Sequence, residues 1–305
     1  MTIDLKSLQN THRLLFAIPL QPLQGNRFQP TGFPSLGAAT FQTNEGQSLL
    51  VESTQSMANH FEHTIWDESK NDIIEEFQGL SHVRVLRNNE FLTDTIIESH
   101  RINSPYILEG KDKTFFEQLK RDLGGLAEGP IDRKLFASMM LRYDINSLVH
   151  GVFLAKKELA GGRLRIARSL SGFIEADGVR IAASGGVKND HVNPSGETNK
   201  GFGNVPFARD EFTAEKITLY VNIDLAQIRG FGLEQDAENL LILLSLYKLR
   251  AFIEQGMRLR TACDLKLAID ATKLASMPVS EQKPPFILPS LERYKRIYLC
   301  LNQEV

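Results

Sequence analysis

The segment LLVESTQSMANHFEHTIWD, residues 49–67, changes its pattern of apolar residues within a few positions. It opens with an apolar run, Leu-Leu-Val, which is typical of the end of a buried strand. Met57, Phe61 and Ile65 then recur every fourth residue, which places them on one face of a helix. The segment therefore predicts a strand that leads directly into a helix.

The other segments with a regular apolar pattern follow in an irregular order. Strands are expected at residues 14–18, 48–51, 147–155, 162–176, 216–225 and 296–301, and helices at residues 114–125, 132–144 and 236–255. A loop is expected at residues 21–41, and a mobile excursion or projecting hairpin at residues 183–204. Because single strands and helices do not alternate, the predicted fold class is α+β rather than a wound parallel sheet.

Composition excludes some classes of protein. The chain has 305 residues and 42% hydrophobic content, enough for about two domains or one domain with large insertions. A net charge of -2 gives no global attraction to nucleic acid, although a local basic groove can exist on a neutral protein. Cys263 and Cys300 lack paired metal spacing, which favours a reducing cytoplasm. The N-terminal segment has no basic stretch followed by a long apolar one, so no signal peptide is expected, and the longest apolar run, residues 240–246, is too short to span a bilayer.

Three hydroxyl groups and one amide occupy the junction of strand and helix, at Ser53, Thr54, Gln55 and Ser56. The first turn of a helix has N–H groups without intrahelical partners, and it carries the positive end of the helix dipole. Together with these side chains, the turn forms a seat for a phosphate without net charge. The alternative is ordinary N-capping, which needs only Ser53 or Thr54 and is more common.

Arginines at three further places are candidates for binding phosphate. Arg101 stands in a loop before a proline, where it could hold a phosphate or pair with a carboxylate. Arg163 and Arg165 alternate with apolar residues, so they share one face of the expected strand, either as phosphate ligands or as a solvated surface. Arg258 and Arg260 follow the longest helix, where the helix dipole also accounts for them.

Signals for other chemistries are weak. His60 and His63 flank Glu62 on the expected helix, but the pattern is not H-E-x-x-H and no third metal ligand is evident. The sequence contains no phosphate-binding glycine loop, no nucleophile elbow and no cysteine zinc pattern. Phe202 and Phe207 in the excursion could stack on bases or anchor the loop on the core.

Longer blocks of the sequence resemble one family. The backbone subunit of the type I-G (formerly I-U) CRISPR effector complex, in the RAMP superfamily, has signature blocks similar in order to GNRFQPTGFPSLGAA, LLVESTQSMANHFE, SHRINSPYIL, NSLVHGVFLA, SGGVK, GFGNVPFARDEFTA and GMRLRTACDL. These blocks extend from about residue 25 to residue 265. Matches of this length are far more specific than any single motif above.

The resemblance implies a fold. A single RAMP-type domain, residues 1–305, would have an RRM-like (ferredoxin-like) palm with helical finger insertions and a projecting thumb hairpin. The palm core would comprise residues of about 1–55, 145–182 and 214–305, the finger-like helical insertion about 56–144, and the thumb-like insertion about 183–213.

The resemblance also implies a role and partners. Several copies of the chain would oligomerise along the spacer of the CRISPR RNA and support pairing of guide with target DNA in antiviral defence. Further partners would be other Cascade subunits, namely the large subunit and the subunit that caps or processes the guide end. The subunit would be cytoplasmic and non-catalytic, with no membrane, cofactor or metal.

Finally, the resemblance implies RNA-binding residues. Residues 53–56 match a serine-serine-glutamine-serine segment that opens a helix against guide-RNA phosphates in the wider superfamily. Other branches continue with lysine and arginine where this chain has Ala58 and Asn59, so the positive charge must come from elsewhere. The expected set is Arg27, Gln29, Ser53, Thr54, Gln55, Ser56, Asn59, Arg101, Asn103, Asn146, His150, Arg163, Arg165, Arg168, Lys188, Arg258 and Arg260.

Two other functions stay open at this point. A metal-dependent ribonuclease that cuts target RNA, as in type III relatives, would use Asp94 or Asp144, and His100 with His150 could act as a metal-free acid and base. A stand-alone RRM-like RNA-binding protein is the other alternative, but the sequence lacks the aromatic RNP signature.

Overall fold

The computed structural model describes residues 5–33, 37–124 and 130–269. The strand expected at residues 296–301, and with it Cys300, lies outside the described residues. Residues 270–305, the C-terminal part of the palm core expected from the resemblance, also lie outside the described residues.

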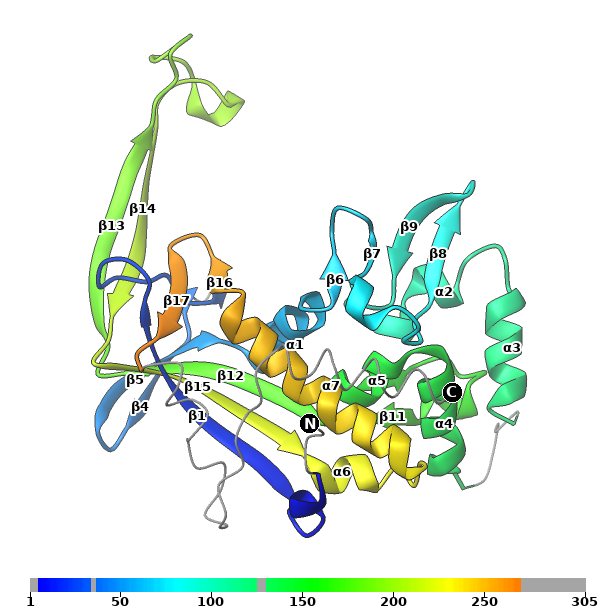
Figure 1. The fold of residues 1–305 in the computed structure, drawn as a ribbon. Helices are drawn as coiled ribbons and strands as arrows, with labels where there is room; N and C mark the ends of the chain where they lie inside the picture. Colours follow the sequence, from blue (N-terminus) through cyan, green and yellow to red (C-terminus); the bar gives the residue numbers. More distant parts are fainter. Residues whose placement is uncertain (1–4, 34–36, 125–129, 270–305) are drawn as a thin grey trace.

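Seven antiparallel strands form the central sheet (Figure 1). In spatial order they are β16 (Met257–Arg260), β17 (Cys263–Leu267), β1 (Arg13–Pro22), β15 (Lys216–Asp224), β12 (Leu170–Asp177), β5 (Gly46–Glu52) and β4 (Thr40–Thr43). The strands expected at residues 14–18, 48–51 and 216–225 are confirmed as β1, β5 and β15. The prediction of an α+β protein is confirmed by this sheet and the helices around it.

One face of the sheet forms the core. Every second side chain of β1 is buried, starting at Leu14. Ile18 lies opposite Leu219 of β15, which in turn lies opposite Ile174 of β12, and all three are fully buried. Because side chains of a strand alternate between faces, a slip of one residue would expose this entire set.

Two helices cover this buried face. Helix α1 (Thr54–His63) packs on β12, and α7 (Gln235–Glu254) packs against α1. The rings of Phe61 and Phe252 meet edge to face, with centroids 5.5 Å apart. Gly172 of β12 allows this close approach, because a Cβ there would lie 3.3 Å from atoms of the Phe61 ring. The helix expected after Ser53 and the one expected at residues 236–255 are thus confirmed, and the helices expected at residues 114–125 and 132–144 are confirmed by helices at Thr114–Asp122 and Arg133–Tyr143.

The remaining elements are short. The helices are α2 (Pro105–Leu108), α3 (Thr114–Asp122), α4 (Arg133–Tyr143), α5 (Ile145–His150) and α6 (Leu225–Arg229). The strand pairs are β2 (Gly32–Phe33) with β3 (Gly37–Ala38), β6 (Trp66–Asp67) with β7 (Asp72–Ile73), β8 (Arg84–Arg87) with β9 (Glu90–Asp94), and β10 (Val152–Leu154) with β11 (Leu164–Ile166). Turns of 3₁₀ helix occur at Lys6–Leu8, Glu75–Phe77, Arg101–Asn103, Ala160–Gly162 and Thr198–Lys200. Within the described ranges, no helix has the length and hydropathy needed to cross a membrane.

Two expected strands and the expected loop need correction. Residues 147–155 contain the end of α5 and then β10, with a break at Gly151. Buried helices and buried strands have the same apolar density, so density alone could not separate them. Residues 162–176 divide into β11 and β12, because Ser169 between them bonds to the backbone of α5. Residues 21–41 contain the end of β1, the pair β2–β3 and the start of β4 rather than only a loop.

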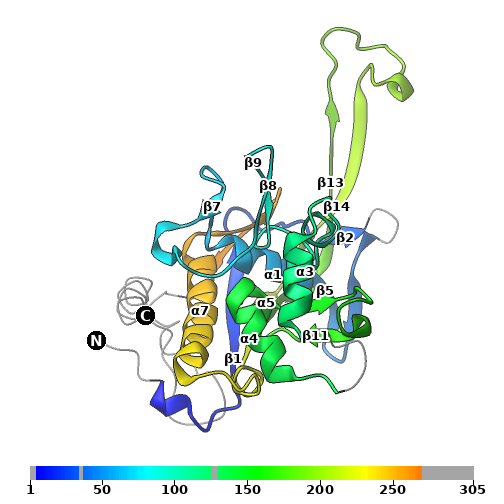
Figure 2. The same cartoon turned by 90° about the vertical axis from the view of Figure 1, so that its right-hand side faces the viewer.

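A long hairpin projects from the sheet. It consists of β13 (Arg180–Lys188) and β14 (Val205–Thr213), paired along their whole lengths (Figure 2). At its tip, the carboxylate of Asp190 accepts hydrogen bonds from the backbone N–H groups of Val192, Asn193 and Gly203. Residues 183–204 therefore lie in an ordered hairpin, whereas the limits of a thumb stay a prediction.

The backbone at Gly151 provides a test of this architecture. Gly151 has a φ of +81°, and a Cβ there would lie 2.9 Å from the carbonyl oxygen of Ile166. Gly151→Ala is therefore expected to lower the free energy of unfolding by roughly 1–3 kcal/mol, as measured by chemical denaturation. Gly110→Ala is the control, because its Cβ would meet nothing closer than 3.6 Å. Equal losses in the two variants would contradict this account of the α5–β10 connection.

Candidate nucleic-acid interface

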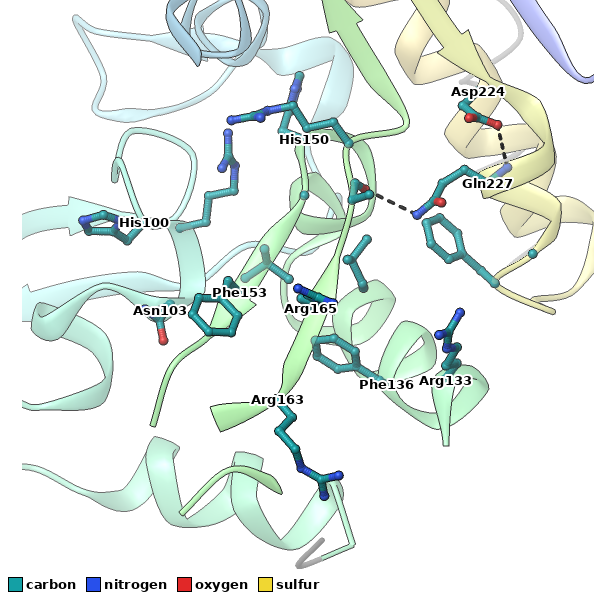
Figure 3. Close-up of a pocket in the computed structure, with 18 of the residues that line it drawn as sticks. His100, Asn103, Arg133, Phe136, His150, Phe153, Arg163, Arg165, Asp224 and Gln227 are labelled. Atoms are coloured by element: carbon teal, nitrogen blue, oxygen red, sulfur yellow. Dashed lines mark hydrogen bonds between the residues drawn. The ribbon is translucent and has the colours of Figure 1, made fainter. Parts of the chain in front are cut away.

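A large open cleft lies beside the central sheet. Its volume is about 1670 Å³, and its walls come from β10, β11, the turn before α2, the starts of α1 and α4, and α6 (Figure 3). Six arginines line it: Arg13, Arg101, Arg133, Arg163, Arg165 and Arg168. Asp224 is the one acidic residue among the described lining residues, and it pairs with Arg13 at 3.3 Å. The cleft is thus strongly positive on a chain whose net charge is -2.

The pair β10–β11 carries one wall of the cleft. Phe153 lies opposite Arg165 in this pair, and both side chains are exposed. Arg163 precedes β11, and its Nε donates a hydrogen bond to the carbonyl oxygen of Ala160 at 2.9 Å. Of the two arginines expected on one strand face, only Arg165 therefore lies within β11, and both line the cleft.

The start of helix α1 reaches the cleft through one residue. The Ser53 hydroxyl accepts a hydrogen bond from the N–H of Ser56 at 3.3 Å, so Ser53 is the N-cap. The Gln55 amide oxygen accepts a hydrogen bond from the guanidinium of Arg168, and both residues line the cleft. Ser53, Thr54 and Ser56 are not among the lining residues. Capping therefore accounts for Ser53, and Gln55 connects the helix start to the positive cleft.

A buried ion pair lies under the cleft. Arg101 donates to Glu62 of α1 through two hydrogen bonds, Nε to Oε1 at 2.6 Å and Nη2 to Oε2 at 2.9 Å. This is the carboxylate pairing that the sequence left open as the alternative for Arg101. Burial raises the pKa of Glu62, and the charge and hydrogen bonds of Arg101 oppose that rise. Burial, and then the charge of Arg101, lower the pKa of Arg168.

A second buried cluster of polar side chains lies next to the cleft. The Nζ of Lys248, on α7, donates a hydrogen bond to Asn146 Oδ1 at 2.5 Å and lies 2.9 Å from His150 Nε2. Burial lowers the pKa of Lys248 to about 7, and burial followed by the charge of Lys248 lowers the pKa of His150 well below its usual value. Asn146 is completely buried and His150 almost so. Asn146 does not line the cleft and His150 lines it with almost no exposed surface, contrary to the expectation that both contact RNA directly.

The other expected residues lie elsewhere. Arg260 pairs with the buried Glu52 and also donates a hydrogen bond to the carbonyl oxygen of Gln29 at 3.1 Å. Arg27 pairs with Glu211 at 3.6 Å, and Arg258 with Asp264 at 3.7 Å. Arg258 and Arg260 belong to β16, Glu52 ends β5 and Glu211 belongs to β14, and none of these residues lines the cleft.

Two expected residues are exposed outside the cleft. Lys188 stands at the end of β13 on the hairpin, and Asn59 lies on α1, where its Oδ1 accepts a hydrogen bond from Gln55 Nε2 at 3.5 Å. Asn103, in contrast, lines the cleft, and its Oδ1 accepts a hydrogen bond from the N–H of Ala155 at 3.1 Å. Of the expected set, the cleft thus brings together Gln55, Arg101, Asn103, His150, Arg163, Arg165 and Arg168.

Sequence reasoning missed several lining residues. Arg13, Arg133, Phe153 and Gln227 belong to the cleft and to none of the expected sets. Arg133 carried a signal, because it occupies the first turn of α4, where the helix dipole disfavours a cation. Phe153 also carried one, since a large apolar residue that alternates with buried neighbours must point outward.

The suspected nuclease residues are buried. Asp94 Oδ2 lies 2.6 Å from Nδ1 of His82, and Asp144 Oδ2 accepts a hydrogen bond from Ser147 at 2.6 Å. Both carboxylates have no exposed surface, so neither reaches the cleft. His100 and His150 both line the cleft, but His150 is almost completely buried.

The helix-face histidines have ordinary surroundings. The His60 ring lies 5.7 Å from that of Phe252, and burial followed by the neighbouring His63 lowers the pKa of His60. In the part of the chain that the structure describes, no group of three or more histidine, cysteine or acidic residues could hold a metal ion.

Comparison with known families decides the classification. The family model of "CRISPR-associated protein GSU0053 (Cas_GSU0053)" matches residues 14–181, which is more than half of the chain. The chain belongs to this CRISPR-associated family. The matched Cas_GSU0053 region contains β10, β11 and most of the arginines of the cleft.

Comparisons with individual proteins are less informative. No curated protein matches the chain. Among solved structures, a chain of a "CRISPR RNA-guided surveillance complex, pre-nicking" has a TM-score of 0.42 and 11% identity, with coverage of 83% of this chain and 73% of that chain. Csc2 from Thermofilum pendens has a TM-score of 0.34 and 9% identity, with coverage of 99% and 80% respectively. At these values neither likeness adds to the assignment to the Cas_GSU0053 family.

The buried Lys248 makes the stability of this Cas_GSU0053 protein depend on pH. Its pKa in the folded state is lowered to about 7, so between about pH 7 and 9 the unfolded chain binds a proton that the folded chain does not. The free energy of unfolding should therefore rise with pH in this window, with a slope approaching about 1.4 kcal/mol per pH unit. Urea denaturation at several pH values measures this slope.

Two variants test the assignment of this slope to Lys248. Lys248→Met should abolish it, whatever its effect on absolute stability, and Lys216→Met, at an exposed position on β15, should retain it. Above this window the effect reverses in sign, because burial raises the pKa of Cys263 to about 11 and of Tyr247 to about 12. A wild-type slope that persists in Lys248→Met would contradict the assignment.

Proposed function

We propose that the chain is the backbone subunit of a type I-G Cascade complex and that its cleft binds the phosphates of the guide RNA. The observation that carries this proposal is the accumulation of arginines in one open cleft of a CRISPR-associated protein. The subtype, the RAMP superfamily and the RRM-like character of the sheet rest on the sequence blocks described above.

The chemistry of the cleft suits a carrier of variable guides. Arginine guanidinium groups bind phosphate oxygens in a way that does not depend on base identity, and spacers differ in sequence. Arg133 and Arg165 have no ion-pair partner among the described residues, so their charges are available to a polyanion. The Gln55–Arg168 contact adds an amide and a cation at the adjoining helix start.

Assembly along the guide is the second part of the proposal. Copies of the subunit polymerise on the spacer, the hairpin β13–β14 serves as the thumb, and the assembled subunits support pairing of guide with target DNA. The hairpin has exposed apolar side chains, including Ile181, Val187 and Phe207, which are suited to contact a neighbouring subunit. The large subunit and the subunit at the guide end complete the set of proposed partners.

The proposed function predicts the salt dependence of RNA binding. Replacing Arg133 and Arg165 together by glutamine removes two proposed phosphate contacts. The slope of log affinity against log salt for single-stranded RNA should then fall by about 0.7 per contact, hence about 1.4 in total. Fluorescence anisotropy with spacers of unrelated sequence measures the slope, and affinity should differ little among them.

A matched variant separates the cleft from general surface charge. Arg87 is an exposed arginine on β8 that does not line the cleft, so Arg87→Gln should leave affinity and slope close to those of the wild type. Equal losses from Arg87→Gln and from the double variant of Arg133 and Arg165 would exclude the cleft as the RNA site.

We also propose that the subunit does not cleave nucleic acid. Metal-dependent hydrolysis of a phosphodiester needs ligands around the ion and an activated nucleophile, and Asp94 and Asp144 are both buried and hydrogen-bonded. Protein incubated with guide and complementary RNA or DNA, with magnesium or manganese, should leave both strands intact on a denaturing gel. Cuts at regular spacing that disappear in Asp94→Ala or Asp144→Ala would establish the ribonuclease alternative instead.

A further inference from the structure

One aromatic ring in the cleft is open to solvent. Phe136, Phe153 and Phe231 are the phenylalanines among its lining residues, and Phe136 and Phe231 are buried, whereas Phe153 is 54% exposed. On β10, Val152 and Leu154 point into the core, so the alternation of the strand turns Phe153 outward. An isolated exposed apolar residue is ordinary on a protein surface, but this one stands inside a cleft lined by arginines.

Two side chains with hydrogen-bond donors border the ring of Phe153. Arg165 lies directly opposite Phe153 in the β10–β11 ladder, and Figure 3 shows the ring between Arg165 and Asn103. The Oδ1 of Asn103 is fixed by the N–H of Ala155 at 3.1 Å, which holds the amide in place and leaves its NH₂ group available for another partner. A flat apolar surface is therefore bordered by a cation and by an amide donor.

This combination fits a nucleobase better than it fits phosphate alone. A phosphate needs the donors but gains nothing from an exposed ring, whereas a base offers a flat face for the ring and acceptor atoms at its edge for the donors. Bases inside a duplex have both faces covered by their neighbours, so only an unpaired or terminal base can lie on the ring. The surrounding charges disfavour an apolar protein segment as the ligand.

We propose that Phe153 is a stacking platform for an unpaired nucleobase of a single strand whose phosphates are bound by the arginines of the same cleft. This proposal rests on the proposed function, because it requires the cleft to bind a nucleic-acid strand. Arg165 and Asn103 border the platform and contact the edge of the stacked base or its adjoining phosphate. Stacking tolerates every base, so the site adds affinity without selecting a spacer sequence.

Binding measurements on two kinds of strand test the platform. Single-stranded RNA is compared with an abasic sugar-phosphate strand of equal length, which keeps the phosphates and lacks the bases. Phe153→Leu should weaken binding of the RNA by roughly 5- to 150-fold and leave binding of the abasic strand unchanged. Phe153→Trp should retain the affinity for RNA, because indole also stacks. Phe41→Leu, at an exposed ring on β4 outside the cleft, is the matched control.

Photocrosslinking then locates the base. RNA that contains 5-iodouridine, irradiated in complex with the wild-type protein, should crosslink to Phe153, as identified by mass spectrometry of the digested complex. Crosslinks found only at Phe202 or Phe207 would show that the base stacks on the hairpin and would overturn the inference.

The two proposals fail in different ways. If neither strand binds with a dependence on salt, the proposed function fails and the platform fails with it. If both strands bind equally well and Phe153→Leu has no effect on either, the arginine cleft stands and the stacking platform is excluded. Circular dichroism of Phe153→Leu confirms that the variant is folded.

Discussion

The ion pair between Arg101 and Glu62 connects the cleft to the core of the domain. Glu62 belongs to α1, which packs on the central sheet, and Arg101 belongs to the turn that also carries Asn103. Asn103 in turn bonds to Ala155, at the end of β10. Loss of one partner would leave a buried charge without compensation, which typically costs about 3–5 kcal/mol. The position of one cleft wall relative to the sheet depends on this contact.

The positive charge of the cleft is local, because the chain as a whole has a net charge of -2. Many of the other basic residues are neutralised close to where they stand, as Arg260 is by Glu52 and Arg27 by Glu211. The cleft differs because Asp224 is the one carboxylate among its described lining residues. A polyanion is thereby attracted to one place rather than to the whole surface.

The sequence predicted those features that depend on local pattern. The change of apolar period near Ser53 marked the end of β5 and the start of α1, and Asp132 marked the start of α4, where its carboxylate accepts the N–H of Leu135. Features that depend on contacts between residues far apart in the sequence could not be predicted. Arg101 pairs with a carboxylate 39 residues away, and α5 was expected as a strand because its apolar residues are buried, a pattern that does not distinguish a buried helix from a buried strand.

Candidate site residues follow the same division. Arg163 and Arg165 were selected because they alternate with apolar residues and Arg168 because of the family resemblance, whereas Arg133 was overlooked within a predicted helix. Asn146 was expected to contact RNA at the surface, but its Oδ1 accepts a hydrogen bond from the buried Nζ of Lys248. Sequence pattern assigns a residue to an element, and only packing decides which side of that element meets solvent.

The hairpin is joined to the sheet without a flexible linker. Strands β12 and β13 are separated by a turn of two residues, as are β14 and β15, and the N–H of Glu215 bonds to the carbonyl oxygen of Asp177 across this junction. Phe212 near the base pairs with Phe28 through two backbone hydrogen bonds of 2.9 Å. The hairpin therefore works as a lever clamped at one end. A force on its tip would therefore act on β12 and β15, which are inner strands of the sheet, because no hinge separates them from the hairpin.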